Sequence, residues 1–191
     1  MDTTDALQKN ILDATLRVFD RKGLKFTMDD LAKELSISKK TIYTVYDDKE
    51  ALFLAMVDYI FDSIKESEQM ILTDPTLGTI EKLQRILGVL PEGYQNIDLR
   101  KLYSLRDKYP KIYHKVELRL ETGWEPTIQL IETGMAEGSI RPVPICLVKM
   151  ILEASIEQFF QRDILAQNHL TYVDALNEVV NILMYGITQR Q

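Results

Sequence analysis

The chain has 191 residues, of which 46% are hydrophobic, and a net charge of −6, so it can bury a sizeable core in one or two domains. Its first ten residues lack the apolar run of a signal peptide. The most apolar stretch, residues 144–156, contains Lys149 and Glu153 and is too short to span a bilayer. We therefore expect a soluble, cytoplasmic protein.

Side chains suited to catalysis or metal binding are scarce. The single cysteine, Cys146, lies among apolar residues and is expected to be a buried thiol rather than a nucleophile. His114 and His169 are far apart and belong to no metal-binding motif, so we interpret them as surface or helix-end residues. Residues 88–95 have the glycine spacing of a phosphate-binding loop but not its lysine. The sequence therefore predicts no enzyme, cofactor or metal site.

Helical periodicity runs through nearly the whole chain and predicts an all-α fold. A first helix over residues 6–22 ends at Gly23, a second begins after Thr27, and a third begins after Ser38 and ends near Tyr46. The second and third helices are too short to be stable alone. Because a three-residue turn joins them, we expect them to pack on the first helix as a helix-turn-helix.

A much longer helix is predicted to follow, from a cap at Asp47 or Asp48 to about residue 72. The later helices are expected at about 77–90, 97–107, 110–137, 144–166 and 171–189, with a kink near Gly123 and Pro126. The organisation is thus a three-helix head over residues 1–47, joined by the long helix to a helical domain over residues 48–191, with about nine helices in all.

The third predicted helix is locally cationic within an acidic chain. Residues 36–46 contain Lys39 and Lys40 and no acidic residue. Lysine pairs usually solvate a helix face, but at the start of the second helix of a helix-turn-helix they favour DNA readout. We expect Lys40 to read a base edge, and Tyr43 and Lys49 to hold phosphates. The predicted DNA contacts are Thr27, Ser38, Lys39, Lys40, Thr41, Tyr43, Thr44, Val45 and Lys49.

Residues 11–53 resemble the DNA-binding head of the tetracycline-repressor (TetR) family of transcription regulators. The matching positions are Ile11, Leu12, Ala14, Gly23, Thr27, Leu31, Ala32, Ser38, Ile42, Tyr43, Tyr46, Lys49, Glu50 and Leu52. Ser36 departs from the pattern by replacing a glycine, and if its backbone is left-handed it costs about 1 kcal/mol. The resemblance implies a homodimeric regulator, most often a repressor, that binds a palindromic operator and is released by a small molecule.

The resemblance also implies that the second domain binds the ligand and forms the dimer. Helices 144–166 and 171–189 are apolar around much of their circumference, which favours a dimer interface over the interior of a monomer. Candidate interface residues are Ile151, Ile156, Phe159, Val180 and Leu183. Candidate ligand-binding residues, each of which could instead be ordinary core, are Met56, Tyr59, Tyr94, Tyr103 and Trp124.

Two other functions stay open at this point. One is a constitutive DNA-binding regulator that is controlled by a protein partner or by no ligand. The other is an all-α enzyme or carrier with an incidental helix-turn-helix, which the lack of a catalytic cluster disfavours. Loss of DNA binding on addition of a ligand would separate the first alternative from a ligand-released repressor.

Overall fold

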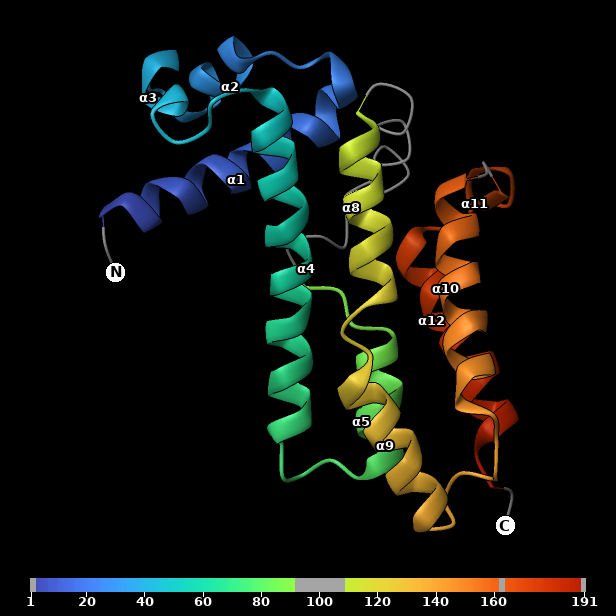
Figure 1. Ribbon diagram of the computed structural model, residues 1–191. Coiled ribbons are helices and arrows are strands. Elements are labelled where there is room, and N and C mark those ends of the chain that lie inside the picture. The colour runs from blue at the N-terminus through green and yellow to red at the C-terminus, as the bar shows by residue number, and fades with distance from the viewer. Residues whose placement is uncertain (1–2, 92–108, 162–163, 190–191) are drawn as a thin grey trace. The chain divides into compact units, whose positions relative to one another are not determined.

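The computed structural model describes residues 3–91, 109–161 and 164–189 (Figure 1). Within these residues the regular elements are helices, and the one β-type pairing is an isolated bridge between Ile140 and Thr188. The all-α fold predicted from the periodicity is confirmed. In this part of the chain no helix is long and apolar enough to cross a membrane.

The predicted helix at 97–107 lies outside the described residues. Those residues contain, in chain order, α1 (Thr3–Lys22), the 3-10 turn η1 (Gly23–Lys25), α2 (Met28–Leu35), α3 (Lys39–Tyr43), α4 (Lys49–Thr73), α5 (Thr79–Leu87), α8 (Pro110–Glu121), α9 (Glu125–Ala136), α10 (Ile145–Gln161), α11 (Ile164–Gln167) and α12 (Tyr172–Ile187).

Two predicted helices are divided in the structure, and a third ends earlier than predicted. The segment 110–137 forms two helices, because Gly123 adopts a φ of +77° between α8 and α9. The segment 144–166 is also divided, with α10 ending at Gln161 and α11 forming a separate short helix. The third helix ends at Tyr43 and gives way to a turn before Tyr46.

The chain divides into two compact units. Of the described residues, the first contains 3–62 and 109–117, and the second contains 63–91, 118–161 and 164–189. The first unit thus includes the start of α4 and most of α8 in addition to the three N-terminal helices. These units are defined by compactness, so the predicted division into a DNA-binding head over residues 1–47 and a second domain over residues 48–191 stays a prediction.

Aromatic side chains form the centre of the first unit. Three phenylalanines are fully buried there: Phe19 of α1, Phe53 of α4, and Phe26, which lies between η1 and α2. The Phe53 ring meets the Phe19 and Phe26 rings edge-on, with centroids 5.5 and 5.4 Å apart, and lies 5.6 Å from the ring of Tyr109. Edge-to-face contacts of this kind add stability beyond the burial of apolar area. They fix α1, α4 and the segment before α2 together.

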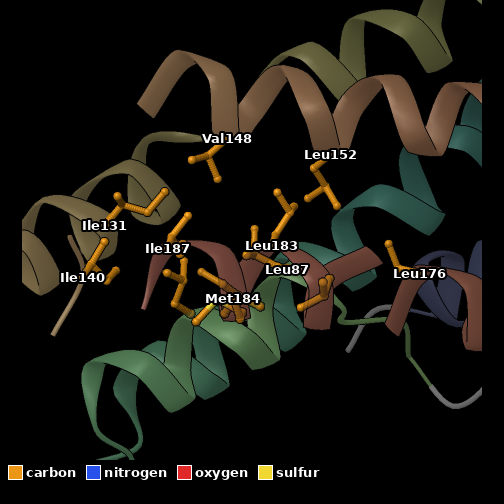
Figure 2. Packing of buried hydrophobic residues seen from close by; sticks show 12 residues of the cluster. Leu87, Ile131, Ile140, Val148, Leu152, Leu176, Leu183, Met184 and Ile187 are labelled. Atoms are coloured by element: carbon orange, nitrogen blue, oxygen red, sulfur yellow. The ribbon is translucent and has the colours of Figure 1, made fainter. Parts of the chain in front are cut away.

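The core of the second unit is aliphatic and is formed by α5, α9, α10 and α12. Figure 2 shows Val148 and Leu152 of α10 pointing toward Leu183 of α12 and Leu87 of α5. The buried members of this cluster are Leu83, Ile86, Leu87, Ile131, Ile140, Val148, Leu152, Leu176, Val180, Leu183, Met184 and Ile187. The last two long helices, α10 and α12, therefore each bury one face within their own chain.

The expectation of a buried cysteine is wrong, because Cys146 is exposed. The buried positions of α10 include Val148 and Leu152, four residues apart on one face. Cys146 is two residues before Val148, about 200° away around the helix, and so faces outward. Its apolar sequence neighbours therefore did not indicate its burial.

Candidate nucleic-acid interface

The second helix of the head begins after Thr27, as predicted, and its start is a capping box. The Asp30 backbone N–H donates to Thr27 Oγ1 over 3.2 Å, and the Thr27 backbone N–H donates to Asp30 Oδ2 over 2.9 Å. Lys22 of α1 donates to the same carboxylate over 2.7 Å. The Lys22 hydrogen bond and the Thr27 N–H lower the pKa of Asp30 to about 2. This carboxylate thus joins the start of α2 to α1.

A left-handed serine makes the turn between α2 and α3. Ser36 has φ 54° and ψ 36°, and its backbone N–H donates to the Lys33 carbonyl. The next N–H, of Ile37, donates to the Ala32 carbonyl. These two bonds satisfy carbonyls at the end of α2. The turn therefore has the glycine-type geometry without the glycine.

Ser38 caps α3 as predicted. Its Oγ accepts a 3.0 Å hydrogen bond from the Thr41 N–H, and the two hydroxyl oxygens lie 2.8 Å apart. Ile42 is fully buried and anchors α3 in the head. With Ile42 turned inward, Lys40, Tyr43 and Thr44 are exposed on the outer side of the segment. The short helix is thus held by its cap and one apolar side chain.

Three acidic residues of α2 form ion pairs within the head. Asp30 and Glu34 bind cations of α1, and Asp29 binds a cation of α3. Glu34 binds Arg21 of α1 over 2.5 Å and Arg17 over 3.3 Å. Asp29 binds Lys39 of α3 over 2.9 Å. Lys40, by contrast, is exposed and has no ion-pair partner among the residues that the structure describes. The two adjacent lysines therefore differ in their surroundings.

Lys49 is placed differently from the sequence-based expectation. Its Nζ donates to the Leu24 carbonyl over 2.9 Å and to the Phe26 carbonyl, and lies 4.1 Å from the centre of the Phe26 ring. The ammonium thus binds the segment between α1 and α2 within the head. This geometry argues against the phosphate contact expected for Lys49 and assigns it a structural role.

The described ligand-binding candidates do not form one site within either unit. Met56 is fully buried in the first unit, and the Tyr59 hydroxyl donates to Asp13 of α1 over 2.8 Å. Trp124 belongs to the second unit, where its indole N–H donates to the Leu120 carbonyl at the end of α8. Tyr94 and Tyr103 lie outside the described residues. The ligand-binding assignments stay predictions.

The candidate interface residues differ in their burial within the single chain, and their role in a dimer stays a prediction. Phe159, Val180 and Leu183 are at most 9% exposed because they pack into the core of their own chain. Ile156 is partly buried against the same core, and Ile151 is 47% exposed. The exposed apolar residues on the outer faces of α10 and α12 are Leu147, Met150, Ile151, Ile182 and Tyr185.

One feature of the sequence indicates this outer face, namely a second set of apolar residues at helical spacing. Leu147, Met150, Ile151 and Ala154 recur at helical spacing on α10, offset from the buried pair Val148 and Leu152. Both sets are apolar, however, so the spacing alone does not say which one faces the core.

Metal binding has no support in this part of the molecule. In residues 3–91, 109–161 and 164–189 no group of three or more histidine, cysteine, aspartate or glutamate residues could hold a metal ion.

Comparison with known proteins identifies relatives of both the head and the whole chain. Residues 11–56 match the model of the bacterial regulatory proteins of the tetR family. The uncharacterized HTH-type transcriptional regulator YvaF of Bacillus subtilis (strain 168) is 28% identical over 183 residues, which cover 95% of this chain and 96% of that protein.

Solved structures share the fold over nearly the whole length. A TetR transcription regulator from Haloarcula marismortui has a TM-score of 0.73 and 19% identity, covering 97% of this chain and 100% of that one. The transcriptional regulator FadR of Bacillus subtilis, crystallised with stearoyl-CoA, has a TM-score of 0.63 and 18% identity, covering 94% and 98%. The fold shared with these structures therefore includes the helices of the second unit as well as the head.

Proposed function

We propose that the chain is a DNA-binding transcriptional regulator of the tetR family, as the match of its head and its full-length similarity to a regulator of this kind support. On this premise it is a cytoplasmic repressor whose homodimer binds a palindromic operator and leaves it when a small molecule binds. The observation that carries the proposal is the outer side of α3. There Lys40, Tyr43 and Thr44 are exposed on a helix that its Ser38 cap and the buried Ile42 hold in place.

These side chains suit the two tasks of an operator-binding helix. Lys40 carries its charge on a flexible stem, has no ion-pair partner in the described part of the chain, and can donate to guanine O6 and N7 in the major groove. The Tyr43 hydroxyl can donate to a phosphate oxygen. Thr44 donates its own hydroxyl to the Thr41 carbonyl over 2.6 Å, and the Ser38 hydroxyl shares a hydrogen bond with that of Thr41, so these two residues are proposed as contacts through their oxygen lone pairs and methyl or methylene groups. The other proposed contacts are Thr27, Thr41 and Val45, whereas Lys39 is paired with Asp29 and is not among them. Lys49 is left out because its ammonium binds carbonyls inside the head.

The proposed dimer interface is the outer face of α10 and α12. We define this face by Leu147, Met150, Ile151, Ile182 and Tyr185, each of which is at least 46% exposed in the single chain. Large apolar side chains gathered on two adjacent helices favour burial against a partner. A two-fold interface uses the same patch on both subunits and would present two recognition helices to the two halves of a palindrome.

The proposed effector is a small molecule that binds in the helical domain over residues 48–191. The presence of stearoyl-CoA in the crystal of the Bacillus subtilis FadR supports an effector of this general kind for a protein of this fold. To release DNA, the ligand must bind the DNA-free protein more tightly, with a coupling of about 1–3 kcal/mol. The same coupling must weaken ligand binding when operator DNA is present.

The experiment that tests the proposed function is selection of bound fragments from genomic DNA. The selected duplex is then titrated with the protein beside a scrambled duplex of the same composition. We expect a palindromic site that binds at least about a thousandfold more tightly than the scrambled one. Equal binding to both duplexes would contradict operator recognition. Candidate effectors suggested by the neighbouring genes should then weaken operator binding without affecting the scrambled duplex.

A further inference from the structure

The two adjacent lysines of α3 are not electrostatically equivalent. Lys39 Nζ lies 2.9 Å from Oδ2 of Asp29, which stands in the first turn of α2. Both partners are open to solvent, with 43% of the Lys39 side chain and 61% of the Asp29 side chain exposed. Lys40 has no such partner among the described residues. Asp29 therefore neutralises one lysine of the pair and not the other.

Folding of the head does not explain this ion pair. Glu34 and Asp30 already bind α2 to α1, and the buried Leu31 and Ile42 pack within the same three-helix head. An ion pair as exposed as Asp29–Lys39 contributes little to stability. A carboxylate on a surface that faces phosphates also opposes DNA binding, because like charges repel. A role in binding accounts better for its presence.

We propose that Asp29 is a positioning residue, which holds Lys39 against α2 and keeps its charge from the phosphates of non-specific DNA. The proposal rests on the proposed DNA-binding role of α3. Phosphate contacts add affinity for every sequence, whereas base contacts add affinity for the operator alone. If Asp29 keeps Lys39 from the phosphates and Lys40 still contacts a base, the affinity for random DNA falls more than the affinity for the operator. The preference for the operator thus increases.

The test is a double-mutant cycle of Asp29→Asn and Lys39→Gln. Each variant is titrated against a fluorescein-labelled random-sequence duplex between about 50 and 200 mM salt. Asp29→Asn should bind roughly fourfold more tightly, the effect of removing a unit charge about 5 Å from a phosphate in water. Its plot of log affinity against log salt should be steeper by about 0.9, as expected for one more phosphate contact.

The cost of losing Lys39 should depend on Asp29. Lys39→Gln should weaken binding less than about twofold in the wild type and roughly fourfold or more in Asp29→Asn, where the lysine is free to contact phosphate. Asp29→Glu keeps the carboxylate and should behave as the wild type. Glu132→Gln on α9 removes the charge of an exposed acid outside the head and should leave the salt slope unchanged.

Two results would overturn the proposal: the same cost of Lys39→Gln in both backgrounds, or a salt slope for Asp29→Asn that equals the wild-type slope. Thermal melting of each variant checks folding, and Asp29→Ser replaces Asp29→Asn if the latter melts early. Failure of the wild-type protein to bind any duplex would instead contradict the proposed function. A protein that binds DNA but shows no coupling between Asp29 and Lys39 contradicts this inference alone.

Discussion

Replacing Lys49 with methionine should destabilise the head rather than weaken a phosphate contact. Methionine keeps most of the apolar stem but removes the ammonium that donates to the Leu24 and Phe26 carbonyls and lies over the Phe26 ring. A hydrogen bond from a charged group is worth about 1.5–3 kcal/mol, and a cation–π contact about 0.5–1 kcal/mol or more. Because Lys49 is partly exposed, we expect a total loss of about 2–4 kcal/mol.

Urea denaturation followed by far-UV circular dichroism measures this loss. Lys40→Met is the matched control, since Lys40 is exposed and should change the free energy of unfolding by less than about 0.5 kcal/mol. The fluorescence of Trp124, the one tryptophan, reports the second unit and should be affected less than the helical signal. Wild-type stability for Lys49→Met, together with a salt slope of DNA binding flattened by about one unit, would refute the structural role.

Three further predictions concern the turn, the capping box and the dimer. Ser36→Gly should raise the free energy of unfolding by about 1 kcal/mol, because Ser36 has a φ of 54°; an unchanged urea midpoint would contradict this. Asp30 has its pKa lowered from 3.8 to about 2, so its stabilising contribution should be complete above about pH 4 and lost as the pH falls to about 2. The urea midpoints of the wild type and Asp30→Asn should therefore converge in acid, and a constant difference would contradict the pairing. Met150→Glu on α10 should give monomers in sedimentation, whereas Met70→Glu, at a somewhat more exposed apolar site on α4, should leave dimers intact.

Much of the head could be predicted from the sequence because its signals are local. Thr27 and Asp30 have capping-box spacing, and Ser36 occupies a position where the chain must turn within three residues. In each case the geometry depends on backbone bonds between residues a few positions apart. The structure accordingly reproduces the helix starts at residues 28 and 39.

Features that depend on distant contacts could not be predicted in the same way. The stem of Lys49 can reach either outward to a phosphate or inward to the carbonyls of Leu24 and Phe26, and its sequence position does not favour either. On α10 and α12 apolar residues occur on all sides, so the inward direction of Val180 and the outward direction of Met150 depend on how the helices pack. The exposure of Cys146 was not predicted for the same reason, because its apolar neighbours on α10 do not show which side of the helix faces the core.

The central claim is that α3 reads an operator, and Lys40→Ala tests it most directly. Wild-type and variant proteins are titrated against the selected operator and a scrambled duplex at several salt concentrations. We predict a loss of about 1–3 kcal/mol on the operator, with relaxed preference at one base pair and a much smaller change on scrambled DNA. An equal loss on both duplexes would make Lys40 a phosphate contact, and no change on either would contradict the assignment of α3 as the recognition helix.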